Sequence, residues 1–261
     1  MSYFVRTGTA TFRPTQHVSG AWNTEEQHIA PALGLMVHAV EADRDRRRDD
    51  GLLVSRLSWD ILGTVPMEAV EVEVRVLRPG RTIELVEAVL LHDARPAVLL
   101  RAWLLRPTGQ PADVGSALVG IPGPDEMSAW DPTTVWPGGF IASAQVRREE
   151  VAPGRAAYWV RSDVPLLDAG AVPQPGPAAT AARLLDIANG MTVRADPRVV
   201  AFPNVDLTAH LFREPVVGWL GFDTTVSFGP GGQGLTSSVL HDELGPFGTM
   251  AQVLTVRPVA R

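Results

Sequence analysis

The chain has 261 residues, of which 45% are hydrophobic and 20% are charged, so it is able to bury a sizeable globular core. Its formal net charge of −6 argues against nucleic acid as a partner, because phosphate binding calls for a basic surface. It contains no cysteine, which excludes disulfides, thiolate metal ligands and a cysteine nucleophile.

The first part of the chain predicts one helix and then strands. Its opening residues lack the layout of a signal peptide, and no stretch is apolar for long enough to cross a membrane, so we expect a soluble cytoplasmic protein without a membrane partner. Apolar residues in 26–42 are spaced for one helical face. The mixed charges at 41–50 predict a solvated loop. Valines alternate with charged residues over 70–76, which is typical of a strand with one wet face.

Strand signals continue and then give way to a segment rich in proline and glycine. Arg78-Pro79-Gly80-Arg81 predicts a turn into a strand over 82–91, and the apolar run 98–105 predicts another strand. From about 106 to 139, proline, glycine and small residues indicate a linker. A second helix is expected from about 178 to 189, where an Asn-Gly pair provides a C-terminal cap.

The two halves of the chain carry the same landmarks in the same order. Each half reads helix, strand, proline, strand, Pro-Gly turn, strand, His-Asp pair, strand and Arg-Pro. The second set follows the first by about 150 residues, and the pairs are Pro66 and Pro215, Pro79 and Pro230, His92 and His241, and Pro107 and Pro258. This repeat implies a duplicated α+β unit, with units at 1–110 and 139–261 and a linker at 111–138.

Comparison of the halves singles out polar positions in the second one. Asp206 falls opposite Leu57 when the prolines are matched, and Ser227 falls opposite Val76 when the Pro-Gly turns are matched. At each position a hydrogen-bonding residue replaces an apolar one. The structural alternative is that both residues belong to the solvated face of a strand, where Thr225 competes with Ser227 for the same role.

Gln252 is singled out by its own strand. By strand alternation it shares one face with three apolar residues, Met250, Leu254 and Val256. An amide on a core-facing row costs about 1–3 kcal/mol if it is unpaired, so it needs partners or a function. A core glutamine satisfied by the backbone is the alternative.

Several stretches together resemble a known family, the double-hotdog acyl-CoA thioesterases of the thioesterase II type. They are Phe202–Thr208, Phe212–Pro215, Gly234–Ser238 and Ala251-Gln252, with Ala21–Asn23, Gln27-His28 and Arg78–Arg81 in the first half. The resemblance covers nearly the whole chain. It implies an α+β tandem hotdog, in which two antiparallel sheets each wrap around a long helix and join into one continuous sheet. It also implies hydrolysis of acyl-CoA to free acid and CoA, with no cofactor.

The resemblance further implies a catalytic trio of Asp, Ser or Thr, and Gln in the second hotdog. By position these are Asp206, which activates a water, Ser227 and Gln252. The family usually has two glycines after the histidine at the head of the first helix, where backbone N–H groups approach the thioester carbonyl. Here Ile29 and Ala30 stand in their place, so we expect their N–H groups to be the oxyanion donors.

Other functions remain open from the sequence. A non-catalytic acyl-CoA-binding protein of the same fold is favoured by the missing glycine pair. An enoyl-CoA hydratase would use an Asp and a His, and Asp206 and His210 share a strand face. The six histidines show no metal-ligand spacing, so no metal site is expected. A homo-oligomer, as a dimer of double hotdogs, is compatible with this layout, and the acyl group is not specified.

Overall fold

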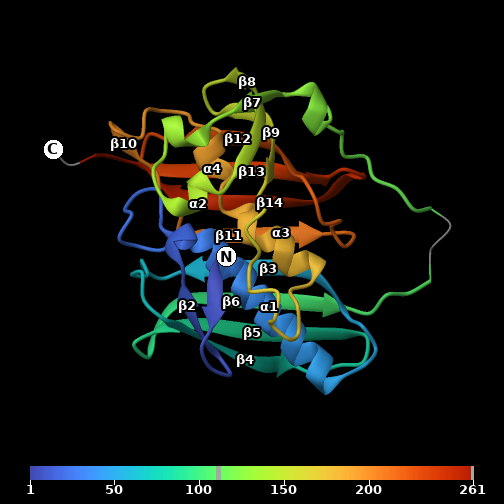
Figure 1. The fold of residues 1–261 in the computed structure, drawn as a ribbon. Coiled ribbons are helices and arrows are strands. Elements are labelled where there is room, and N and C mark those ends of the chain that lie inside the picture. The colour runs from blue at the N-terminus through green and yellow to red at the C-terminus, as the bar shows by residue number, and fades with distance from the viewer. Residues whose placement is uncertain (110–112, 260–261) are drawn as a thin grey trace.

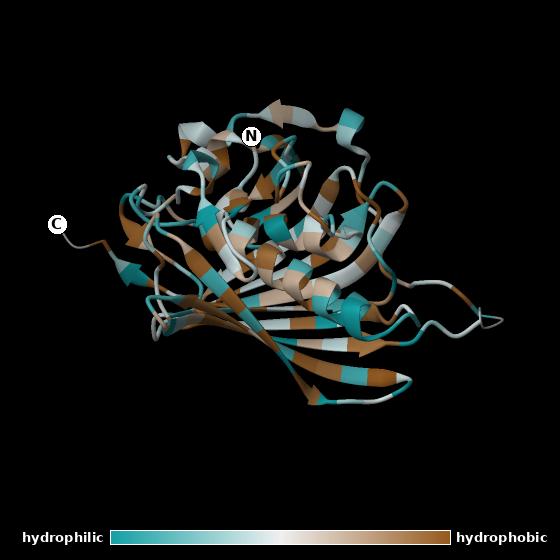
Figure 2. Ribbon diagram, turned by 60° about the horizontal axis from the view of Figure 1, so that its bottom comes forward, coloured by the Kyte–Doolittle hydropathy of each residue, from teal (hydrophilic) through white to brown (hydrophobic). Residues whose placement is uncertain are grey.

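The computed structural model describes residues 1–109 and 113–259 and shows one large antiparallel sheet with the helices on one side (Figure 1, Figure 2). In these residues thirteen strands form the sheet, in the order β1-β2-β4-β5-β6-β3-β11-β14-β13-β12-β9-β8-β7. The first half supplies β1 (Phe4–Arg6), β2 (Thr11–Pro14), β3 (Leu53–Ile61), β4 (Val70–Arg78), β5 (Ile83–His92) and β6 (Arg95–Leu105). The second supplies β7 (Ser128–Trp130), β8 (Gln145–Ala152), β9 (Arg155–Arg161), β11 (Asp206–Leu211), β12 (Leu220–Phe228), β13 (Gln233–Asp242) and β14 (Gly245–Thr255). A separate small sheet pairs β10 (Val200–Ala201) with β15 (Arg257–Pro258).

Two helices from different halves lie together over the sheet. They are α1 (Ile29–Arg47) and α3 (Pro177–Leu185), which are blue and gold near the centre of Figure 1. Because α1 lies between the sheet and α3, it is buried on most sides over residues 30–42. The remaining helical segments are short: α2 (Gly139–Ala142), α4 (Ala188–Met191) and the 3-10 turns η1 (Gln16–Val18), η2 (Pro124–Glu126) and η3 (Pro132–Thr134). In the part of the chain that the structure describes, no helix is both long and apolar enough to span a membrane.

The central strands β3 and β11 join the two halves into one sheet. They pair antiparallel, with Ser58 directly opposite Thr208, and the hydroxyl oxygens of these two residues lie 2.9 Å apart. Each half therefore extends the same sheet from the centre outwards. The α+β architecture with one continuous sheet, which the sequence implied, is confirmed.

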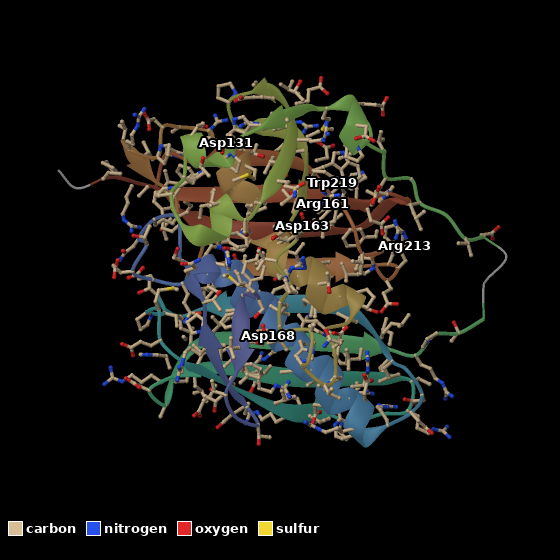
Figure 3. The ribbon with its side chains drawn as sticks, viewed as in Figure 1. Asp131, Arg161, Asp163, Asp168, Arg213 and Trp219 are labelled. Carbon is tan, nitrogen blue, oxygen red and sulfur yellow. The ribbon has the colours of Figure 1, made fainter. Side chains whose placement is uncertain are left out.

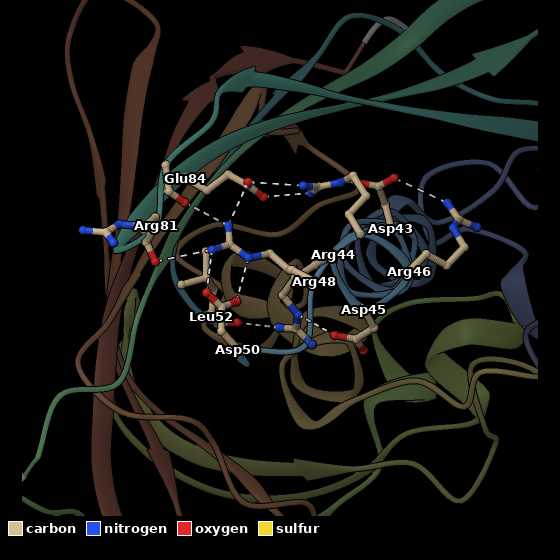
Figure 4. A network of polar contacts seen from close by, with 11 residues as sticks. Asp43, Arg44, Asp45, Arg46, Arg48, Asp50, Leu52, Arg81 and Glu84 are labelled. Atoms are coloured by element: carbon tan, nitrogen blue, oxygen red, sulfur yellow. Dashed lines mark hydrogen bonds and ion pairs between the residues drawn. The ribbon is translucent and has the colours of Figure 1, made fainter.

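The charged run after the first helix is ordered, so the prediction of a solvated loop from residue 41 was wrong. The helix continues to Arg47 because its last arginines find a buried partner. Glu84 on β5, 2% exposed, accepts hydrogen bonds from Arg47 at 2.8 and 3.2 Å and from Arg48 at 2.9 Å. Figure 4 shows the contact between Glu84 and Arg48 within this network, which fastens the end of α1 to the sheet.

Replacement of Glu84 by Gln is expected to lower the free energy of unfolding by about 1–3 kcal/mol, because two guanidinium groups lose a buried anionic partner. Urea unfolding of wild type and variant measures the loss. Glu73→Gln is the matched control, since Glu73 lies exposed on the neighbouring strand β4. This variant should unfold at the same urea concentration as wild type. Equal midpoints for Glu84→Gln and wild type would contradict the role given to this network.

The second predicted helix is interrupted. Instead of one helix over 178–189, α3 ends at Leu185 and α4 begins at Ala188, so Asp186 and Ile187 stand at a break. The segment expected as a linker also contains structure, because β7 pairs with β8 at the edge of the sheet.

Candidate active site

A cavity of about 310 Å³ lies where the head of α1 meets the second half of the chain, and it is called the main cavity because the buried Asp186 lines it; more open pockets of about 480 and 460 Å³ lie elsewhere. The first half lines it with the segment before α1, including Trp22 and His28, and with Ile29, the first residue of α1. The second half lines it with Asp186 and Asn204, among others. Trp22 is 46% exposed, so it lies at the rim of the main cavity. The site is thus built by both halves together.

The break between α3 and α4 places a carboxyl group in the main cavity. Asp186 is 5% exposed, and its Oδ1 accepts hydrogen bonds from Asn204 Nδ2 at 2.6 Å and from Gln252 Nε2 at 2.7 Å. Burial raises the pKa of Asp186 to about 7, although the hydrogen bonds from Asn204 and Gln252 act to lower it. The group therefore changes its charge near neutral pH, as a general base requires.

Gln252 lies where the strand pattern placed it. It is 1% exposed on the inner face of β14, in a row with the buried Met250 and Leu254. Its Nε2 is bound to Asp186, whereas its Oε1 has no hydrogen-bond partner among the described residues. An unpaired buried acceptor beside a carboxyl group is available to hold a water molecule.

The other three strand residues singled out from the sequence lie elsewhere. Asp206 lies on the outer side of β11, because its neighbour Leu207 faces the helices, and its Oδ1 accepts the backbone N–H of Val253 at 2.6 Å. Ser227 and Thr225 are exposed on the outer side of β12. None of the three lines the main cavity. The structure instead joins Gln252 to Asp186, which lines the main cavity and also accepts a hydrogen bond from Asn204.

The head of α1 offers one free backbone donor. His28 caps the helix, and its Nδ1 accepts the N–H of Ala30 at 3.2 Å. Burial lowers the pKa of His28 to about 3, so the ring is neutral and able to accept. The N–H of Ile29 has no acceptor among the described residues, and Ile29 lines the main cavity. Of the two donors expected from the sequence, the N–H of Ile29 is thus the one that remains available.

Two further charged groups line the main cavity, Glu26 and Arg257. Arg257 is held by the small sheet, in which it lies opposite Ala201, and it donates to Thr255 Oγ1 at 2.9 Å. A group of side chains with metal-ligand spacing occurs in the described residues at Glu68, His92 and Asp93, outside this cavity.

Comparison with known proteins identifies the family. The sequence matches the model of an acyl-CoA thioesterase N-terminal domain over residues 18–105 and that of an acyl-CoA thioesterase C-terminal domain over residues 105–256. The chain belongs to the acyl-CoA thioesterase family. As a member it is a hydrolase of thioesters, which confirms the class of enzyme expected from the sequence. A search of curated proteins gives no match.

Solved structures show the same fold. A proposed thioesterase from Novosphingobium aromaticivorans is 21% identical, with a TM-score of 0.72 and coverage of 98% of this chain and 99% of that one. A protein with a hotdog fold from Alicyclobacillus acidocaldarius is 13% identical, with a TM-score of 0.74 and coverage of 98% and 96%. Acyl-CoA thioesterase II TesB2 from Mycobacterium marinum is 13% identical, with a TM-score of 0.65 and coverage of 98% and 95%. The fold of the chain is therefore a double hotdog.

Proposed function

We propose that this family member hydrolyses acyl-CoA with Asp186, in place of Asp206, as the base that activates water. The observation that carries the proposal is the buried carboxyl group of Asp186 in the main cavity, with a pKa raised to about 7 and a hydrogen bond to Gln252. A structural role alone does not account for a buried acid that forms no ion pair with the described residues, because burial of its charge costs stability.

The hydrolysis follows from the positions of three groups of the protein. A water bound between the Asp186 carboxylate and the free Gln252 Oε1 has its lone pair available to the thioester carbonyl carbon. As the new C–O bond forms, the water proton passes to Asp186 and the negative charge moves to the carbonyl oxygen. The N–H of Ile29, at the positive end of α1, stabilises that oxygen. The C–S bond then breaks, and the proton on Asp186 passes to the departing sulfur.

Asn204 and Arg257 have supporting roles in this proposal. Asn204 holds the Asp186 carboxylate through its hydrogen bond of 2.6 Å and is itself bound to the backbone oxygen of Asp206 by its Nδ2 at 3.1 Å. Arg257 lines the same cavity and offers a guanidinium group to the phosphates of CoA. The hydratase alternative receives no such support, because Asp206 and His210 both lie on the outer side of β11, away from the main cavity.

Wild-type protein is expected to release CoA from acyl-CoA with a kcat/KM that rises with pH below about 7 and levels off above it, because only the Asp186 carboxylate accepts the proton of water. The absence of cysteine allows the released thiol to be followed with a thiol reagent without background from the protein.

Glu41→Gln is the matched control for this pH profile. Burial also raises the pKa of Glu41 to about 7, but Glu41 lies on α1 against Gly176 and does not line the main cavity. The variant should keep the wild-type profile. A rate independent of pH between 5 and 8, or a profile that changes in Glu41→Gln, would contradict the assignment of Asp186.

A further inference from the structure

A second cavity of about 20 Å³, the inner cavity, adjoins the main cavity behind Asp186. The two cavities share Ala21, Trp22, His28, Asp186 and Asn189 as lining residues. The residues that line the inner cavity but not the main one include four large apolar side chains, Trp136, Ile141, Met191 and Phe202, which form its apolar wall. The inner cavity is thus a short extension of the main one, and this apolar wall borders it.

Three aromatic rings form the firmest part of this wall. Trp22, Trp136 and Phe202 meet edge to face, with centroid distances of 4.7 Å from Trp22 to Trp136, 5.3 Å from Trp22 to Phe202, and 5.9 Å from Trp136 to Phe202. Trp136 is 4% exposed, and its Nε1 donates to the backbone oxygen of Gly190 at 2.8 Å. Movement of this indole would therefore break a buried hydrogen bond as well as the ring contacts.

The positions of the catalytic groups orient the substrate relative to this wall. With the carbonyl between Asp186 and the N–H of Ile29, the pantetheine arm leaves through the main cavity towards Arg257, which lines that cavity and not the inner one. The acyl group lies on the other side of the carbonyl, where Asp186 also lines the inner cavity. An inner cavity this small has room for a few carbon atoms beyond the carbonyl and no room for a long acyl chain.

We propose that the wall of Trp22, Trp136 and Phe202 restricts the enzyme to thioesters of short acyl groups, of about two to four carbons. This inference rests on the proposed function, because it takes the carbonyl to be attacked beside Asp186. It takes Trp136, from the segment before the second unit, as the residue that determines the limit on acyl length.

Two substitutions change the inner cavity in opposite directions. Trp136→Leu keeps an apolar side chain but removes the outer part of the indole, so it deepens the cavity. Gly190→Ala shortens it, because a Cβ at Gly190 would lie 3.4 Å from Trp136 Nε1, at ordinary contact distance and without a strained backbone angle. Trp219→Leu is the matched control, since Trp219 packs under Arg161 at 5.0 Å and lines neither cavity (Figure 3).

The test is kcat/KM by thiol release for acetyl-, butanoyl-, octanoyl- and dodecanoyl-CoA. Wild type and Trp219→Leu are expected to favour butanoyl-CoA over dodecanoyl-CoA by about 10²-fold or more. Trp136→Leu should reduce that preference at least about tenfold. Gly190→Ala should lower kcat/KM for butanoyl-CoA, relative to kcat/KM for acetyl-CoA, by about threefold to tenfold. Gly190→Ala keeps the test decisive if Trp136→Leu does not fold.

Two failures are distinguishable. Wild-type enzyme that hydrolyses dodecanoyl-CoA as fast as butanoyl-CoA overturns the size limit and leaves the thioesterase function intact. Absence of thiol release from every acyl-CoA rejects the proposed function instead. In that case calorimetry still tests the size limit, by measuring the binding of the unreactive thioethers S-butyl-CoA and S-dodecyl-CoA. The size limit requires S-butyl-CoA to bind at least about tenfold more tightly than S-dodecyl-CoA.

Discussion

Replacement of Asp186 by Asn is expected to reduce kcat for acyl-CoA hydrolysis by about 10²–10⁴-fold, because it removes the general base and leaves the shape of the site unchanged. The Oδ1 of an Asn at this position still accepts the hydrogen bonds that Asn204 and Gln252 donate to Asp186. Binding of acyl-CoA should therefore persist. Thiol release under saturating acyl-CoA measures the loss.

The same substitution is expected to stabilise the protein at pH 8. Burial raises the pKa of Asp186 above its usual value, to about 7, so the native state holds a proton that the unfolded chain releases at lower pH. Stability therefore falls as the pH rises through this window, and the full loss is present above about 7. The Asn variant has no such loss of stability, so its free energy of unfolding at pH 8 should exceed that of wild type by on the order of 1–3 kcal/mol. The gain should shrink as the pH falls towards 4, and thermal unfolding at pH 5 and pH 8 tests this.

Asp206→Asn is the matched control for activity. It makes the same chemical change at a carboxylate that faces away from the cavity and accepts the N–H of Val253, a hydrogen bond that an amide oxygen is able to replace. It should hydrolyse acyl-CoA at close to the wild-type rate. If Asp206→Asn is inactive and Asp186→Asn retains activity, the base is Asp206, as the sequence alone suggested.

The sheet and the burial of one candidate site residue could be predicted from the sequence because both leave a local pattern. Strand alternation and the repeat of landmarks at Pro66 and Pro215 indicated two units of helix and antiparallel strands. Gln252 could be found because an amide among apolar residues on one strand face is locally out of place, and it is buried as that pattern requires. The joint between the halves is a pairing of β3 with β11, which follows from the resemblance rather than from any local signal.

Asp186 was missed because its role depends on where a helix ends. The apolar spacing continues past it through Ile187, so the pattern predicted one helix over 178–189 and treated Asp186 as part of it. The structure breaks the helix there, and its two partners come from 18 and 66 residues away in the chain. One signal was available, since Asp186 is a lone acid in the apolar stretch 184–188. The charged run at 41–50 shows the converse, because Glu84 is a distant partner that turns an expected loop into helix.

Replacement of Gly34 by Leu is expected to prevent the protein from reaching its native fold. The helices α1 and α3 cross at this glycine, where a Cβ would lie 2.6 Å from Arg183 Cβ and 2.8 Å from its Cα and backbone nitrogen. These atoms belong to or adjoin a buried backbone and are not the end of a flexible side chain, so the helices themselves must separate. Expression with the soluble fraction measured beside wild type gives the first test.

Gly34→Ala makes the effect measurable in a folded protein. Alanine favours an isolated helix over glycine by about 1 kcal/mol, but here the clash with Arg183 outweighs that gain, and overpacking should lower stability by about 1–3 kcal/mol. Gly120→Ala is the control, because nothing lies within 4 Å of a Cβ at Gly120. The displacement should also lower activity, since α1 carries the N–H of Ile29 and α3 ends at Asp186. If the Gly34→Ala variant unfolds at the same urea concentration as wild type and hydrolyses acyl-CoA at the same rate, the helix crossing does not set the geometry of the site.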